Sequence, residues 1–157
     1  MEDKKKSFNK AKNYALYILN FRDYTKKQMK DKLKTKEYEE DIVDEVIKFL
    51  LEYKLLNDDN LGRRMTRDKS KLNRYGKNKI KQYLQNKGIE RNLAKEIVED
   101  EIADEKEYEN AYYNGVKKYK KVKDDPKAYE KVARFLSYKG FEYSVIKKVL
   151  NELFKRD

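Results

Sequence analysis

Apolar positions along the chain follow the 3.6-residue period of amphipathic helices, and one such pattern occurs three times. The copies are Leu33-x-x-Lys36-x-Tyr38-Glu39-x-x-Ile42-x-x-x-Val46, then Leu84-x-x-Lys87-x-Ile89-Glu90-x-x-Leu93-x-x-x-Ile97, then Leu136-x-x-Lys139-x-Phe141-Glu142-x-x-Val145-x-x-x-Val149. Because they start at residues 33, 84 and 136, their spacing is 51 and then 52 residues. Such a period is typical of a supersecondary unit in tandem, each unit lending its apolar face to its neighbour.

Each unit is predicted to hold three helices, and no segment shows the alternation of a strand. Helix starts are indicated by a capping box from Thr25 to Gln28, by Asn57, and by Asp125 with Pro126 at the first helical position. The predicted helices are 8–19, 25–33, 39–53, 58–73, 77–86, 91–102, 103–122, 126–138 and 142–155. We therefore predict an all-α protein of three tandem three-helix repeats, residues 1–56, 57–102 and 103–157, forming an elongated, curved body.

Composition narrows the possible functions. Of the 157 residues, 38% are hydrophobic and 44% charged, which suits a thin-cored helical protein. Without cysteine or histidine there is no thiol nucleophile, imidazole base or thiolate zinc site, and no Gly-rich phosphate loop occurs. No apolar stretch is long enough to cross a bilayer, and no signal-peptide hydrophobic region follows the first residues. We expect a monomeric cytoplasmic protein that is not an enzyme and needs neither cofactor nor metal.

Charge alternates along the chain, which the net charge of +11 alone does not reveal. Residues 62–91 carry 11 basic and 2 acidic side chains, whereas residues 92–109 carry 2 basic and 8 acidic ones. On a helical wheel of 61–74, Leu61, Met65 and Leu72 share one face and are predicted to dock onto the repeat stack. The predicted binding residues, on and beside the opposite face, are Arg63, Arg64, Arg67, Lys71, Arg74, Lys77, Lys79 and Lys81.

These cations have two interpretations. They can form a solvated helix face in a lysine-rich protein, or they can bind an anionic surface, since the planar fork of arginine donates in pairs to phosphate or carboxylate. The acidic cluster around Glu99–Glu105 lacks the ligand spacing of a calcium loop and is interpreted as a solvated helix surface or as a partner for basic faces of adjacent repeats. Tyr14, Tyr38 and Tyr83 lie on apolar faces, so core packing is favoured over base stacking.

Three stretches resemble motifs of the RecX family, which regulates the RecA recombinase. The family's closing motif is resembled by Phe135-Leu136-Ser137-Tyr138-Lys139-Gly140-Phe141. The motif that opens its second repeat is resembled by Leu55-Leu56-Asn57-Asp58 with Leu61. Its first-repeat motif is resembled by Phe21-Arg22-Asp23-Tyr24-Thr25 with Gln28, Met29 and Leu33. The likeness covers about residues 10–155 in the family's order. Lys139 stands where the family usually has arginine, and lysine cannot make the paired planar contact.

The resemblance implies a curved body of three-helix repeats that binds the RecA nucleoprotein filament and restrains filament growth, strand exchange and ATP hydrolysis. Its partners would be the RecA filament and single-stranded or duplex DNA. One alternative is a helical module that binds nucleic acid directly, without RecA, because three-helix units with a basic helix also occur in helix-turn-helix proteins. Another is a helical scaffold that binds peptides through its alternating charge.

Overall fold

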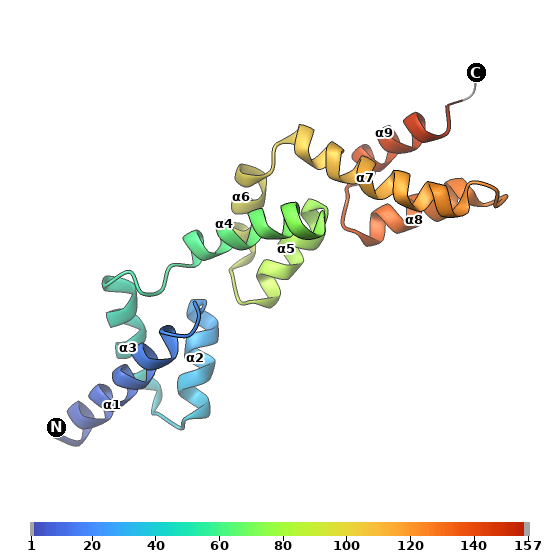
Figure 1. Cartoon of the computed structure of the whole chain (residues 1–157). Coiled ribbons are helices and arrows are strands. Elements are labelled where there is room, and N and C mark those ends of the chain that lie inside the picture. The colour runs from blue at the N-terminus through green and yellow to red at the C-terminus, as the bar shows by residue number, and fades with distance from the viewer. Residues whose placement is uncertain (1, 156–157) are drawn as a thin grey trace.

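The computed structural model describes residues 2–155, which form helices joined by turns and contain no strand (Figure 1). The helices are α1 (Glu2–Leu19), α2 (Lys26–Thr35), α3 (Glu40–Glu52), α4 (Asp58–Asp68), the π-helical segment η1 (Lys69–Asn73), α5 (Lys77–Asn86), α6 (Arg91–Glu101), α7 (Asp104–Val122), α8 (Ala128–Tyr138) and α9 (Tyr143–Leu153). The prediction of an all-α fold of three three-helix repeats is confirmed. Repeat 1 is α1–α3, repeat 2 is α4–α6 with η1, and repeat 3 is α7–α9.

The repeated apolar positions form the interior of each repeat. Leu33, Leu84 and Leu136, the first residues of the three copies, are each fully buried. The residues that close the copies, Val46, Ile97 and Val149, are likewise 0% exposed. Burial of such a side chain contributes roughly 1.5–3 kcal/mol, so the tandem pattern marks the core of all three repeats.

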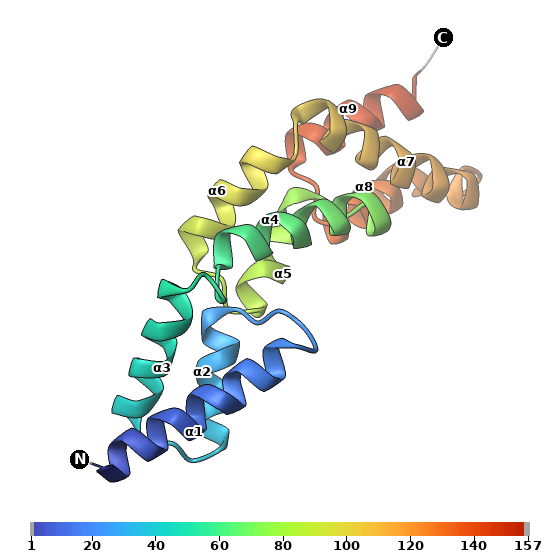
Figure 2. The same cartoon turned by 60° about the vertical axis from the view of Figure 1, so that its left-hand side comes forward.

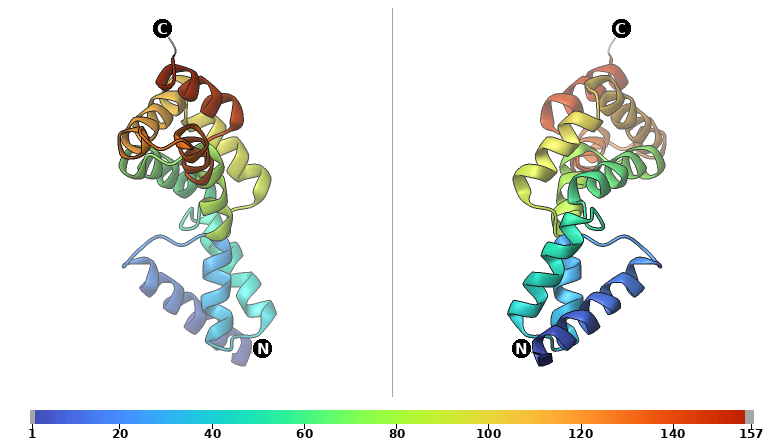
Figure 3. Two further views of the ribbon diagram at one scale, coloured as in Figure 1. Left: turned by 90° about the vertical axis from the view of Figure 1, so that its right-hand side faces the viewer. Right: turned by 90° about the vertical axis from the view of Figure 1, so that its left-hand side faces the viewer.

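The three repeats do not share one continuous apolar interior, contrary to the expectation that each lends an apolar face to the next. The buried apolar residues form three separate clusters, one in each repeat. The repeats follow one another along an extended body with the two ends of the chain far apart (Figures 1 and 2). Figure 3 shows the first repeat projecting from the other two as a lobe of its own.

Neighbouring repeats are joined by polar and backbone contacts at equivalent turns. The turn between α5 and α6 meets the start of α2, where Thr25 Oγ1 donates to the Lys87 carbonyl oxygen at 2.6 Å (Figure 2). The turn between α8 and α9 meets the start of α5, where Gly76 N donates to the Lys139 carbonyl at 2.8 Å and Asn78 N to the Gly140 carbonyl at 2.9 Å. A main-chain contact of this kind fixes one repeat against the next without apolar burial.

Two of the three predicted helix starts are confirmed. Thr25 forms a complete capping box with Gln28, and the Asn57 side chain accepts from Asn60 N. The third is wrong in detail, because α8 begins at Ala128 rather than at Pro126. Asp125 Oδ1 instead accepts from Lys127 N at 2.8 Å, and this local turn holds the proline outside the helix.

Candidate partner-binding surface

The acidic C-terminal end of α6 neutralises the first cation of the predicted ridge. Arg63 Nε lies 2.7 Å from Asp59 Oδ1, and its terminal nitrogens lie 3.2 Å from Asp100 Oδ2 and 3.4 Å from Glu101 Oε1. Hydrogen bonding to Asp59 is the largest cause that raises the Arg63 pKa. Only 24% of the Arg63 side chain is exposed, so this residue connects α4 to α6.

Lys77 and Lys81 are also held inside repeat 2. Lys77 Nζ lies 3.1 Å from Glu99 Oε2, and only 7% of its side chain is exposed. Burial by itself lowers the Lys77 pKa, but its hydrogen bond to Glu99 and nearby carboxylates outweigh burial, so the pKa is raised. Lys81 Nζ lies 2.9 Å from Glu99 Oε1 with 17% of its side chain exposed. Both lysines connect α5 to α6, and Lys77 is too buried to contact a partner directly.

The backbone of Lys77 also reaches α7. Lys77 N donates to Glu107 Oε2 at 2.9 Å, and Glu107 is buried with no hydrogen-bond partner for Oε1 among the described residues. Burial raises the pKa of Glu107 to about 7. The start of α5 is thus attached to repeat 3 through a carboxyl group that titrates near neutral pH.

Arg64, Arg67 and Lys71 face outward. Arg64 is 54% exposed beside Asp23 of repeat 1, and Arg67 is 57% exposed with one ion pair among the described residues, 3.1 Å to Glu101 Oε2. Lys71 is exposed and forms no ion pair with any residue between 2 and 155. These side chains are accessible to an anionic partner.

The helix that carries the ridge is not α-helical along its whole length. After Asp68 it continues as η1, a π-helical segment with more residues per turn. The wheel that placed Leu72 on the docking face is therefore wrong beyond Asp68, and Leu72 is 75% exposed. Leu61 and Met65, which precede η1, do pack inward as predicted.

Arg74 ends η1 in the left-handed conformation with φ at 52°. Its guanidinium lies 4.1 Å from the ring centroid of Tyr113 on α7, and its Nη1 donates to Asn110 Oδ1 at 3.4 Å. Lys79, on α5, lies over two tyrosine rings, 4.3 Å from Tyr75 and 4.5 Å from Tyr138. Both cations are partly buried, and each brings repeat 2 against repeat 3.

Comparison with known proteins identifies the family of this fold. Three domain descriptions match in order: the first three-helix domain of RecX over residues 11–50, the second over 57–97 and the third over 104–150. The chain belongs to the RecX family. It is 46% identical over 150 residues to the regulatory protein RecX of Clostridioides difficile strain 630, covering 94% of this chain and 70% of that one.

Other RecX proteins agree in sequence and fold. The regulatory protein RecX of Clostridium perfringens strain 13 is 35% identical over 154 residues, covering 96% of this chain and 71% of that one. The crystal structure of RecX from Lactobacillus salivarius superposes with a TM-score of 0.88 and 29% identity, covering 94% of this chain and 97% of that one.

Two buried asparagines of this RecX family member were missed in the sequence. Asn110 Nδ2 donates to the carbonyl and hydroxyl oxygens of Ser70 at 3.2 and 3.0 Å, and Asn114 Nδ2 donates to the Arg74 carbonyl at 2.9 Å. Asn110 attaches the start of η1 to α7, and Asn114 attaches its end at Arg74. Their spacing of one helical turn on a packed face was the available indication.

In this RecX fold the acidic residues at the end of α6 and the start of α7 form ion pairs with the basic helices α4 and α5. Glu99, Asp100 and Glu101 form ion pairs with Arg63 or Lys77 within repeat 2, whereas Asp104 of repeat 3 pairs with Lys77 of repeat 2. These carboxylates therefore do meet basic faces, but mostly of their own repeat and not, as predicted, of a neighbouring one. Between residues 2 and 155 no group of three acidic side chains is arranged to hold a metal ion. No helix in that range is long and apolar enough to span a membrane.

Proposed function

We propose that this protein binds the RecA–DNA nucleoprotein filament in the cytoplasm and restrains the recombinase, without catalysing a reaction. The observation that carries the proposal is the extended body of a regulatory family, bearing outward cations on its central repeat. An extended body can contact several protomers of a helical filament at once. Bound in this way it would oppose filament growth, strand exchange and the conformational cycle that accompanies ATP hydrolysis.

The binding surface of this proposal, the outer ridge, consists of Arg64, Arg67, Lys71, Arg74 and Lys79. These cations would neutralise DNA phosphates or acidic side chains of the recombinase. Arg63, Lys77 and Lys81 would support the ridge through their ion pairs instead of touching the partner. The ridge needs no cofactor or metal to act, because its contacts are charge-assisted hydrogen bonds.

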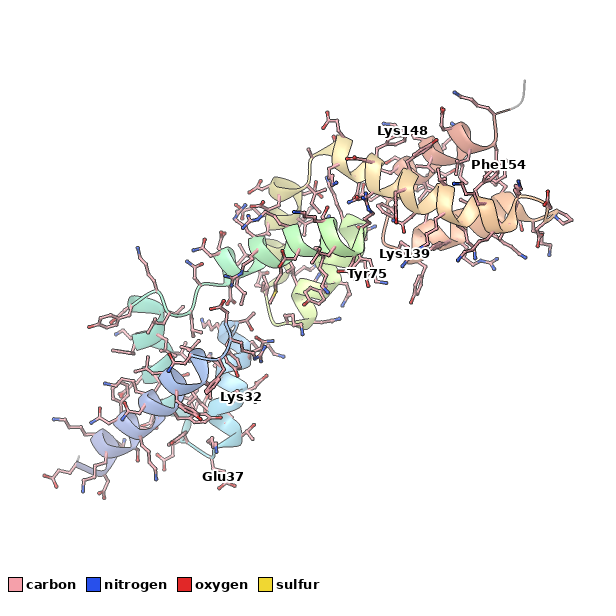
Figure 4. All side chains as sticks on the ribbon, in the orientation of Figure 1. Lys32, Glu37, Tyr75, Lys139, Lys148 and Phe154 are labelled. Carbon is pink, nitrogen blue, oxygen red and sulfur yellow. The ribbon has the colours of Figure 1, made fainter. Side chains whose placement is uncertain are left out.

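The test adds the protein to RecA assembled on single-stranded DNA and follows ATP hydrolysis. We expect inhibition at substoichiometric protein, and loss of inhibition when Arg67, Lys71 and Arg74 are all changed to glutamate. A matched control changes Lys32, Lys34 and Lys48 of repeat 1 to glutamate, which alters net charge equally at exposed positions (Lys32 is labelled in Figure 4). Equal loss in both variants would remove the outer ridge from the proposal.

Two further results separate the alternatives. Inhibition that appears only when the protein exceeds the available DNA sites favours direct competition for DNA, and hence the nucleic-acid module. If the three ridge cations neutralise phosphates of a single strand, their reversal should flatten the log–log salt slope of binding by about 2. An unchanged slope with lost inhibition would assign these residues to the recombinase instead of the DNA.

A further inference from the structure

A groove of about 730 Å³ lies along the outer face of α7, where Arg74 from the end of η1 reaches it. We call this the α7 groove. It lies within the size range of ligand pockets in proteins. Its principal lining residues are Arg74, Tyr112, Tyr113, Lys117, Lys120 and Lys121.

The lining residues of α7 share one face of that helix because they recur at intervals of four. The opposite face, which includes Ala111 and Gly115, is buried. Tyr112 and Tyr113 remain 38% and 48% exposed, so part of each side chain is accessible to a ligand. The groove thus has an aromatic part near the middle of α7 and a cationic part toward its C-terminal end.

The aromatic part is organised before any ligand binds. Arg74 stacks over Tyr113 at 4.1 Å, and its backbone is held by Asn114. The backbone of Arg74 is left-handed, which is unfavourable for a residue other than glycine, and its guanidinium also donates to Asn110 Oδ1. A planar guanidinium on an aromatic ring is the kind of surface on which nucleic-acid bases stack.

The cationic part of the groove carries positive charge that is suited to an anionic ligand. Lys117, Lys120 and Lys121 form no ion pair with any residue in the described range 2–155. The groove contains one carboxylate, Glu109, and that group lies 3.6 Å from Lys106 Nζ. Four cations against one carboxylate, next to exposed tyrosines, suit a ligand that presents both negative charge and flat aromatic rings.

We infer that the α7 groove binds a segment of single-stranded nucleic acid, with a base stacked at Tyr113 and Arg74 and the following phosphates at Lys117, Lys120 and Lys121. From Tyr113 to Lys121 the helix rises about 12 Å, the length of roughly three stacked nucleotides. The inference deepens the proposed function, because it specifies an unpaired strand as the nucleic acid bound. The site itself can be tested with DNA alone.

The test measures fluorescence anisotropy of a short labelled oligothymidylate and of an abasic strand with the same number of phosphates. Tyr113→Leu should weaken binding of the oligothymidylate by roughly 5- to 150-fold, the loss expected for one stacked base, whereas Tyr113→Phe should bind like wild type. The abasic strand should bind wild type and Tyr113→Leu equally. Tyr17→Leu is the matched control, since Tyr17 is 61% exposed on repeat 1.

Charge reversal tests the phosphate contacts independently. Lys120→Glu with Lys121→Glu should flatten the salt slope by about 1.4 for both strands. Equal weakening of both strands by Tyr113→Leu, or no binding of wild type to either strand, would overturn the inference. So would binding of an acidic tyrosine-containing peptide in preference to oligothymidylate.

Parallel ATPase measurements keep the two proposals apart. If wild type fails to inhibit RecA but Tyr113→Leu selectively loses oligothymidylate binding, the proposed function fails and the groove stands. If wild type inhibits RecA but Tyr113→Leu weakens binding of the oligothymidylate and of the abasic strand equally, the groove fails and the proposed function stands. Circular dichroism of each variant verifies that it is folded.

Discussion

The junction between repeats 2 and 3 makes a quantitative prediction for Gly140→Ala. Gly140 has φ of 96°, and a Cβ there would lie 2.5 Å from Lys79 N, inside van der Waals contact with backbone that cannot rotate away. The same turn in repeat 1 carries Glu37, also left-handed at φ 65°. Glu37 lies at the α2–α3 turn, away from the other repeats (Figure 4). Positions 37 and 140 therefore share a conformation and differ in whether a neighbouring repeat is present.

Comparing positions 37 and 140 separates two contributions to the free energy of unfolding: the strain of a left-handed backbone and the contact between repeats 2 and 3. At position 37, alanine should be less stable than glycine by about 1 kcal/mol, the penalty of a left-handed backbone. At position 140 the same penalty applies, with about 1–3 kcal/mol for overpacking. Stretching the bonds from Gly76 and Asn78 adds up to about 1 kcal/mol each. The total at 140 is about 2–6 kcal/mol.

Urea unfolding followed by helical circular dichroism measures both differences, comparing Glu37→Gly with Glu37→Ala and wild type with Gly140→Ala. In a stacked repeat protein the junction energy couples neighbouring repeats, so Gly140→Ala should either lower the single midpoint or split the transition, with repeat 3 unfolding separately. An alanine–glycine difference of the same size at 37 and 140, with one transition, would refute the claim that main-chain contact joins the repeats.

Three further predictions concern buried polar groups. Burial raises the Glu107 pKa to about 7 from an ordinary 4.5, so this carboxyl group loses its proton at lower pH in the unfolded chain than in the folded one. The free energy of unfolding should therefore fall by up to about 3 kcal/mol between pH 4.5 and 7. In Glu107→Gln the melting temperature should depend less on pH across that window. Asn110→Ala should cost about 1–3 kcal/mol in urea unfolding, because the Ser70 carbonyl loses its partner. Lys77→Met should cost about 2 kcal/mol by the same assay, because its bond to Glu99 is lost.

The fold was predictable because its determinants are local. The capping box at Thr25 and the cap at Asn57 mark helix starts in the sequence itself. Periodic apolar residues such as Leu33 and Leu84 mark the buried faces. The junctions were not predictable in the same way, since a hydrogen bond from Gly76 to Lys139 depends on how two repeats meet.

The candidate surface was predicted less well, because a helical wheel assumes a constant 100° per residue. The π-helical turn after Asp68 rotates the last part of the ridge, which exposes Leu72 and brings Arg74 onto Tyr113. Nothing in the composition of 69–73 distinguishes this turn from an α-helix. What stabilises it is Asn110 on α7, forty residues later in the chain.

Charge counted along the sequence also differs from charge available to a partner. Along the ridge, contact with carboxylates decreases with each turn toward α7: Arg63 meets three, Arg67 meets one, and Lys71 meets none among residues 2–155. Available positive charge therefore increases toward Arg74, where the outer ridge reaches the α7 groove. A polyanion attracted by Arg67 and Lys71 would be guided toward Tyr113, so ridge and groove would act as one track instead of two independent sites.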